Sequence, residues 1–341
     1  MSDTLEITTG SFWRLPNPAG PAPLRRPGSV RRTSTIDVTW PEGRTGPQRL
    51  VGRARDILTP RAGGAPVVLA EDAMTVLIPS DRIIREITSE PPRPELSRFV
   101  GVRLGAPLRT MLQESLPQER EAGTPLHLMI DDLPGASLVS GWAWSRWIDA
   151  WKAPAPGEPA QRPMEGVCIG FRPGSAALLR DGGTANDHRC AEVPPLTHPD
   201  DPDGWHAITE PPGVSMRRAR RIDVRVEDGV IRIHSGFQDS ASAPNLPAGH
   251  RVAVHEYVLE ATADLATGRV LSLAAEPRVL PFRECIDAPG NIERLLDASM
   301  RDLRPMVLET LRKTLGCTHL NDALRMLSDA PLLARHALTS A

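Results

Sequence analysis

Hydrophobic and polar residues alternate along four short segments in the second half of the chain, a pattern typical of half-buried β-strands. The predicted strands cover residues 222–226, 230–235, 255–263 and 270–275. Turn signals separate them at Glu227-Asp228-Gly229 and at residues 264–268. The pattern therefore predicts a small antiparallel sheet.

The apolar period then changes to that of a helix over residues 292–315. Pro305 cannot donate the hydrogen bond of a helix interior, so we place it in the first turn of a second helix. Thr318 is predicted to cap a final helix. This arrangement puts Cys317 and His319 at a helix amino terminus.

The first half of the chain repeats this order of elements. Strands are predicted at residues 35–40, 49–56, 66–78 and 82–88, followed by a helix at 96–116. Some of the residues also repeat. Arg31-Arg32-Thr33-Ser34-Thr35-Ile36-Asp37-Val38 returns about 186 residues later as Arg217-Arg218-Ala219-Arg220-Arg221-Ile222-Asp223-Val224. We therefore predict an α+β protein of two related halves, each a small antiparallel sheet followed by helices.

Four regions follow from this pattern. Residues 1–30 are rich in Pro, Gly and Arg and are expected to form a disordered arm. The first half covers 31–134, a tryptophan-rich insert and linker covers 135–213, and the second half with its Cys/His cluster covers 214–341. In the repeat alignment, Thr124-Pro125-Leu126-His127-Leu128 occupies the place of Cys317-Thr318-His319-Leu320.

Composition narrows the class of protein. A chain of 341 residues can form two domains with proper cores. We find no run of eighteen apolar residues and no secretory leader pattern, so a cytoplasmic protein of bacterial type without membrane contact is expected. A net charge of -2 argues against a nucleic-acid partner. The one dense basic run, residues 217–221, is interpreted as a solvated strand start, with an anion or partner contact as the alternative.

Candidate metal ligands gather in the second half. His255 begins a predicted strand, Cys285 follows the sheet, and Cys317 and His319 lie at a helix start. Two thiolates and two imidazoles that meet at one end of such a domain would suit zinc or an iron-sulfur cluster. Cys317 and His319 are also candidates for a metal-free catalytic site, because a helix amino terminus favours a thiolate. The alternative without chemistry has buried free cysteines and a histidine bonded to the backbone.

A second candidate for catalysis is the carboxylate pair Asp131-Asp132. Adjacent helical residues face different directions, so the two are not expected to share a proton. The structural alternative is a polar helix end before Pro134-Gly135.

Other residues carry weaker signals. The set Trp142, Trp144, Trp147 and Trp151 is expected to pack the insert onto the core, with an apolar pocket wall as the alternative. The loop residues His188, Cys190, His198 and His206 lack the spacing of a metal site. The segment Gly170-Phe171-Arg172-Pro173-Gly174-Ser175 matches no phosphate loop, and the chain shows no nucleotide cofactor motif.

Several segments resemble a bacterial domain family of unknown function. These are His255 to Tyr257, Thr262-Ala263-Asp264, the Pro-x-x-x-Cys element Pro281 to Cys285, and Gly316-Cys317-Thr318-His319-Leu320. The segments Arg31-Arg32-Thr33-Ser34, Gly52-Arg53-Ala54-Arg55-Asp56 and residues 131–136 resemble a longer, actinobacterial-type branch of that family. This resemblance implies membership of that family and indicates almost nothing about a catalytic activity.

The layout of the candidate ligands also resembles the iron-sulfur cluster scaffold fold. The resemblance implies that His255 takes the first ligand position, Cys285 the second, and Cys317 with His319 the third. The chain departs from that pattern because a histidine replaces the first cysteine and Thr318 separates the last two ligands. The first half would then be a degenerate copy that retains only His127.

Together these signals predict a protein that binds zinc or iron at His255, Cys285, Cys317 and His319. An open metal position and a groove between the halves would suit a lyase, isomerase or hydrolase that acts on a small, partly apolar molecule. The alternatives are a non-catalytic iron-sulfur or metal carrier and a structural interaction module. Neither the substrate nor the oligomeric state follows from the sequence.

Overall fold

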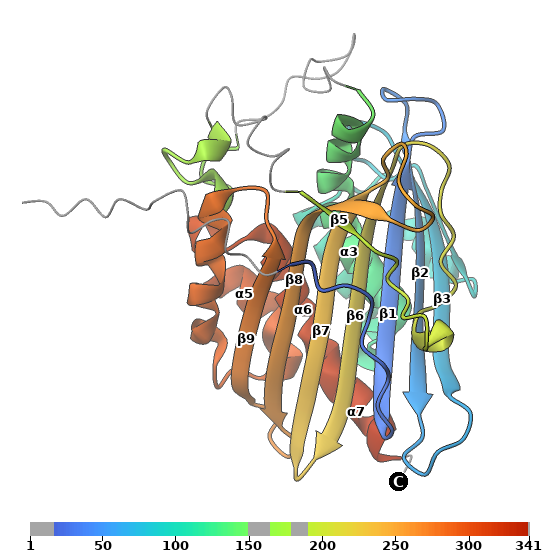
Figure 1. The fold of residues 1–341 in the computed structure, drawn as a ribbon, viewed down its shortest axis with the longest axis vertical. Helices are drawn as coiled ribbons and strands as arrows, with labels where there is room; N and C mark the ends of the chain where they lie inside the picture. Colours follow the sequence, from blue (N-terminus) through green and yellow to red (C-terminus); the bar gives the residue numbers. More distant parts are fainter. Residues whose placement is uncertain (1–16, 149–163, 179–189, 340–341) are drawn as a thin grey trace, which may run out of the picture.

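The computed structural model describes residues 17–148, 164–178 and 190–339, and its fold class is α+β. Over these residues, nine strands form one antiparallel sheet with helices behind it (Figure 1). The strands are β1 (Ser29–Thr39), β2 (Gln48–Thr59), β3 (Val67–Ile78), β4 (Glu86–Glu90), β5 (Ala191–Val193), β6 (Ser215–Glu227), β7 (Val230–Ala241), β8 (Arg251–Asp264) and β9 (Val270–Val279). Each strand predicted from alternation overlaps one of these, and β4 begins four residues later than predicted.

The sheet consists of two four-strand meanders that meet at its centre and of the short strand β5, which pairs with β8. The first is β1 to β4 and the second is β6 to β9, and β1 pairs with β6 along its whole length. In this register Arg31 lies opposite Asp223 and Asp37 lies opposite Arg217. The strands that the sequence assigns to two small sheets therefore share one continuous sheet, while their relationship by duplication stays a prediction.

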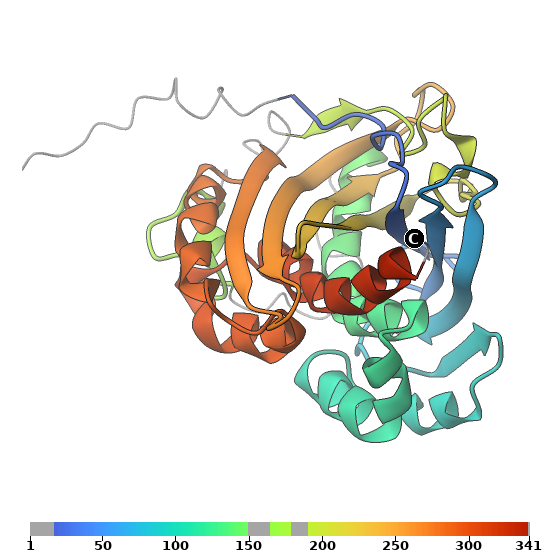
Figure 2. The same cartoon turned by 90° about the horizontal axis from the view of Figure 1, so that it is seen from below.

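The helices occupy the concave side of the curved sheet (Figure 2). They are α1 (Ala106–Ser115), α2 (Pro117–Ala122), α3 (Pro125–Val139), α5 (Leu303–Thr310), α6 (Thr318–Met326) and α7 (Ala330–Leu338). Helix α3 packs on β1 and β2, and α7 packs on β6 and β1. One hydrophobic core fills the space between the helices and both meanders.

Two predicted helices are broken. The helix predicted at 96–116 is a 3-10 helix (Pro94–Phe99) followed by α1, because Gly101 and Gly105 between them adopt positive φ angles of 85° and 112°. The stretch 292–315 divides into the end of a 3-10 helix (Arg283–Leu295), a 3-10 turn (Met300–Asp302), α5 and a second 3-10 turn (Lys313–Leu315). Pro305 lies in the first turn of α5, as predicted.

The helix starts also need correction. Thr124 is the N-cap of α3 and its hydroxyl accepts a hydrogen bond from the His127 amide at 3.3 Å. At α6 the N-cap residue is Cys317, not Thr318. Asp131 and Asp132 do not form a helix end, because α3 continues through Pro134 to Val139. Tertiary packing holds this helix although Pro134 contributes no amide hydrogen.

The convex face of the sheet is covered by irregular chain segments rather than by helices. Residues 17–28, which the sequence assigns to an arm, cross in front of the strands in Figure 1. The Ala22 amide donates to the Leu196 carbonyl at 2.8 Å, and Arg31 Nη2 donates to the Pro23 carbonyl at 2.7 Å. Within the described residues, no helix has the length and apolar character needed to cross a membrane.

Candidate functional site

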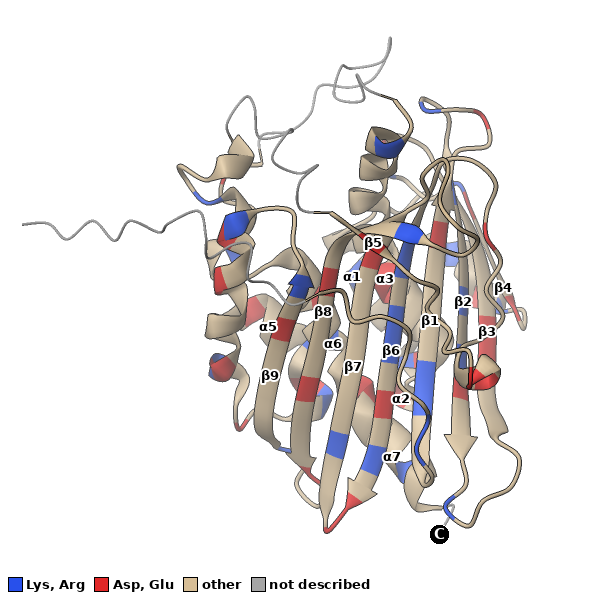
Figure 3. Cartoon of the chain, in the orientation of Figure 1, with Lys and Arg blue, Asp and Glu red and all other residues tan. Residues whose placement is uncertain are grey.

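The basic run of β6 is buried at the centre of the sheet, so its interpretation as a solvated strand start is wrong. Figure 3 shows basic residues gathered along β1 and β6. Arg217, Arg218, Arg220 and Arg221 are each at most 5% exposed. Arg217 pairs with Asp37 at 2.7 Å, and Arg220 pairs with Asp132. Carboxylates from distant parts of the chain neutralise Arg217, Arg218 and Arg220, which makes their burial possible, whereas Arg221 shares Asp223 of its own strand with Arg31.

Helix α3 contributes two buried aspartates that face different arginines. Asp131 binds Arg325 at 2.5 Å and Arg304 at 2.5 Å, whereas Asp132 faces Arg220. Burial disfavours the charged form of Asp131, but the two arginines outweigh it and hold the pKa of Asp131 far below its ordinary value. The two aspartates face different arginines and do not share a proton, and the interpretation of the pair as a polar helix end is wrong, because both carboxylates lie inside α3 and neutralise buried arginines.

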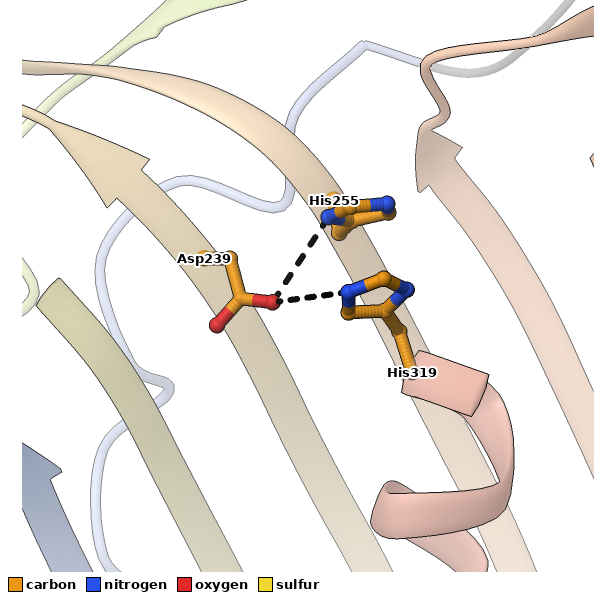
Figure 4. Close-up of side chains that lie close together, drawn as sticks. All are labelled: Asp239, His255 and His319. Carbon is orange, nitrogen blue, oxygen red and sulfur yellow. Dashed lines mark ion pairs between the residues drawn. The ribbon is translucent and has the colours of Figure 1, made fainter. Parts of the chain in front are cut away.

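Asp239, His255 and His319 form the one group of potential metal ligands found among the described residues (Figure 4). Asp239 on β7 and His255 on β8 are opposite one another in the strand register. Helix α6 brings His319 onto them from behind the sheet, and one ligating atom from each residue lies within 4.8 Å of the others. The sequence pointed to both histidines but not to Asp239.

The spacing within this triad is too long for hydrogen bonds. Asp239 Oδ2 lies 3.6 Å from His255 Nδ1 and 3.7 Å from His319 Nε2. The buried Nδ1 of His255 has no hydrogen-bond partner in the described part of the chain. The two imidazole rings stack, with centroids 3.4 Å apart and planes 18° apart. The three side chains thus bring one potential ligand atom each close together without hydrogen bonds to one another.

Both imidazoles are in the form that binds metals. Burial, helped by the neighbouring His319 ring, lowers the pKa of His255 well below its ordinary value. Burial together with Arg218 and Arg220 does the same to the pKa of His319. Neutral rings keep a nitrogen lone pair available at neutral pH.

Residues around the triad fix its orientation. Arg218 Nε donates to Asp239 Oδ1 at 2.8 Å, and its Nη2 donates to Oδ2 at 2.9 Å. On the other side, His319 Nδ1 lies 3.3 Å from the Thr318 hydroxyl and 4.0 Å from the Cys317 sulfur. A proton on Nδ1 satisfies these contacts and leaves the Nε2 lone pair directed at Asp239. Cys317 therefore contacts the far nitrogen of His319 rather than the point where the triad converges.

Cys285 lies in a separate cluster of thiols. Its surroundings include Cys317, Cys168 and Tyr257, and all four side chains are buried. Burial and the neighbouring sulfurs raise the pKa of Cys285 well above its ordinary value, and burial raises the pKa of Cys317 to about 11. These cysteines are held as thiols. No sequence pattern groups Cys168 with them, because this residue belongs to the insert.

The other histidines that the sequence singled out lie elsewhere. His127 is buried in α3, where burial and Arg304 lower its pKa to about 4. His206 is buried between the Thr33 and Thr35 hydroxyls, at 2.9 and 2.8 Å. Cys190 contacts Arg146, and His198 lies on the 190–213 segment without joining a ligand group among the described residues. His188 lies outside the described residues.

The tryptophans of the insert pack against the sheet. Trp142 is 7% exposed, and Trp144 contacts Trp40 edge to face with centroids 5.5 Å apart. Trp147 Nε1 donates to the Ser242 carbonyl at 2.9 Å. Trp144, alone among the described members of this set, also lines a cavity of about 620 Å³ together with Trp40, and charged residues such as Asp37 and Arg53 belong to the same wall. Trp151 lies outside the described residues.

Asp239 was detectable in principle from the alternation of its strand. Residues Ile231, Ile233, Ser235 and Phe237 alternate as buried positions of β7, and Asp239 continues the series. A carboxylate at the next inward position needs a partner, which makes it a candidate for a site. The predicted strand ended at residue 235 and so did not reach it.

The triad lies in a segment of the chain that matches a family model of unknown function. Neither the curated proteins nor the solved structures include a match to the chain. Residues 216–332, about a third of the chain, match a family model described as "Protein of unknown function (DUF2889)", and this segment contains Asp239, His255 and His319.

Proposed function

We propose that this protein binds one zinc or iron ion at Asp239, His255 and His319. The observation that supports the proposal is the spacing of 3.6 and 3.7 Å between the carboxylate oxygen and the two ring nitrogens. Two ligand atoms about 2.0–2.1 Å from one ion, at a tetrahedral angle, lie about 3.4 Å apart. The spacing therefore fits ligands around an ion better than it fits hydrogen-bonded side chains.

The donor set favours a transition metal over magnesium or calcium. Two imidazole nitrogens and one carboxylate are found in zinc hydrolases and in mononuclear iron enzymes. Arg218 would act as the outer partner that orients Asp239, and its positive charge would weaken ion binding. Cys317 and Thr318 would orient His319 in the same way.

Three protein ligands leave at least one coordination position for water or a substrate oxygen. This supports our preference for a lyase, isomerase or hydrolase over a purely structural ion. The His319 side chain is 15% exposed, against 7% for His255 and none for Asp239, so a small molecule would approach from the side of His319. We propose a small and partly apolar substrate.

Metal analysis of anaerobically purified protein, combined with its absorption spectrum, tests this proposal. We expect about one equivalent of zinc or iron in the wild type, no sulfide, and none of the visible bands of an iron-sulfur cluster. The double variant His255→Ala, His319→Ala should lose the ion, and Cys285→Ser should retain it as a matched control. Iron with stoichiometric sulfide would instead support the alternative of an iron-sulfur carrier. If the purified protein contains no metal and takes up neither added zinc nor added iron(II), both the single-ion site and the iron-sulfur carrier are overturned. The interaction module then remains.

A further inference from the structure

Two cavities lie on the convex face of the sheet, where residues 17–28 cross it (Figure 1). Their volumes are about 420 and 580 Å³, within the range of small-molecule sites. Pro23 and His234 belong to the walls of both, so the two cavities adjoin. The metal-ligand triad lies on the other face of β7, beneath α6.

Beneath these cavities lies a cluster of three buried arginines that has fewer carboxylate partners than guanidinium groups. Arg25 and Arg31 share Asp201, at 2.5 and 3.7 Å, and Arg31 and Arg221 share Asp223. Three guanidinium groups therefore rely on two carboxylates, and the three arginine side chains are at most 9% exposed. An uncompensated buried charge is costly, so this cluster has room for one more negative group.

The surrounding groups respond to that excess of positive charge. Burial and Arg31 lower the pKa of Arg221 to about 9. Burial is the main cause that lowers the pKa of His234 to about 4, and the positive charges of Arg221 and three further arginines add to it. The cluster therefore creates a positive potential in the wall that the two cavities share.

His234 is oriented to donate a hydrogen bond. Arg221 Nη2 lies 2.9 Å from His234 Nδ1. Because a guanidinium can only donate, Nδ1 must accept, and the ring proton of neutral His234 is on Nε2. The neighbouring Gly236 has no side chain, and an added Cβ there would lie 3.5 Å from Arg221 Nη2. Residue 236 therefore adds no side chain over the Arg221 guanidinium.

The two cavities differ in polarity. The smaller one is lined by Arg26, Arg225 and Arg232, and Glu260 is an acidic residue in its wall. The larger one is lined by apolar groups, among them Pro21, Leu196 and Trp205. Glu256 in the larger cavity is occupied by hydrogen bonds from the Gln238 amide and the Ala19 backbone, each at 2.9 Å.

We propose that these adjoining cavities bind a small molecule with an oxyanion group and an apolar portion. The oxyanion, a carboxylate or a phosphate, would contact His234 Nε2 and the Arg221 guanidinium, with Arg26 at the rim. The apolar portion would occupy the larger cavity beside Trp205. This site is independent of the proposed metal ion.

Calorimetric titration of the purified protein with hexanoate, hexyl phosphate and hexan-1-ol tests the proposal. We expect saturable binding of at least one of the two anions, and binding of the alcohol at least tenfold weaker. His234→Phe and Arg26→Gln should each weaken anion binding about tenfold, the typical loss on removing a charge-assisted contact. Arg312→Gln, on the helix side of the sheet, is the matched control and should bind like the wild type.

The comparison between the two anions identifies which oxyanion the site prefers. Alcohol that binds as tightly as the anions would overturn the proposal, as would anion binding unchanged in His234→Phe and Arg26→Gln. Absence of saturable binding by all three compounds would also overturn it. Repeating the titration on His255→Ala, His319→Ala should give the wild-type result, which separates this site from the proposed metal function.

Discussion

Arg218 holds the Asp239 carboxylate with two parallel hydrogen bonds of 2.8 and 2.9 Å, and both side chains are at most 1% exposed. Asp239 therefore belongs to two systems at once. It neutralises a buried arginine of the central strand β6, and it supplies the only carboxylate of the candidate metal group in the described part of the chain. An ion bound there would share this carboxylate with the guanidinium.

This double role gives Asp239→Asn two expected effects. The variant should lose the bound ion, and its free energy of unfolding should fall by about 3 kcal/mol, because Arg218 loses one buried carboxylate partner. Urea unfolding monitored by circular dichroism measures the second effect. Asp297→Asn removes a carboxylate from an exposed pair with Arg269 and should change stability by less than about 0.5 kcal/mol. Equal stability of the two variants would contradict the role given to Asp239.

The cysteines should affect metal binding unequally. We expect His319→Ala to abolish binding, because it removes a ligand. Cys317→Ser should weaken it by about tenfold, because it alters only the group beside His319 Nδ1. Cys285→Ser should leave the affinity unchanged. Competition with a chelator of known affinity gives the three values, and complete loss of metal in Cys285→Ser would restore that cysteine as a ligand.

His206 should make the protein sensitive to acid. Burial of the ring is the main cause that lowers its pKa to about 3 in the folded state, and the positive charges of Arg55 and Arg217 add to it. In an unfolded chain the pKa is about 6.5. Below pH 6.5 the unfolded chain takes up a proton that the folded chain cannot, so stability is retained above pH 6.5 and is lost as the pH falls toward 3. Between pH 7 and 5 we expect a loss of about 2 kcal/mol from this residue.

Urea unfolding at these two pH values provides the measurement. In His206→Gln the difference between pH 7 and pH 5 should shrink by about 2 kcal/mol. The Thr33 and Thr35 hydroxyls are within hydrogen-bonding distance of the ring and give the glutamine amide nearby partners. A difference that is the same in the variant and the wild type would show that His206 is not buried neutral.

Asp131 should matter for folding and not for the ion. Asp131→Asn leaves Arg325 and Arg304 with fewer buried carboxylate partners, so we expect a loss of about 3 kcal/mol in unfolding free energy. The metal content per folded molecule should stay that of the wild type. A stable variant that lacks the ion would assign Asp131 a functional role instead.

The α+β class and most strand positions could be predicted because alternation is a local signal. The burial of Arg218 could not, since its partners Asp132, Asp239 and Asp322 come from three separate elements. In isolation, five residues with four arginines have the composition of a solvated segment. Only the pairing of β6 with β1 and β7, and the helices packed behind, supply the carboxylates.

The two histidines of the candidate site were predictable because each lies in an element with a clear local pattern. His319 follows from the helix that starts after Gly316, and His255 lies on an alternating strand. Grouping Cys285 with them assumed that the turn after the sheet brings this cysteine to the two histidines. That turn does approach Cys317 at the helix start, but Cys285 is buried there beside the insert residues Cys168 and Gly170, in a cluster separate from the triad. Such an approach between distant segments has no local signal.

Titration of metal-free protein with cobalt(II), followed by absorption spectroscopy, tests the central proposal most directly. Cobalt occupies sites of the zinc type, and its spectrum distinguishes nitrogen and oxygen ligands from thiolates. We expect binding of about one equivalent, visible ligand-field bands, no thiolate-to-cobalt charge-transfer band, and no binding by His255→Ala, His319→Ala. Absence of binding by the wild type, or a strong thiolate band that disappears in Cys285→Ser, would contradict an ion held by Asp239, His255 and His319.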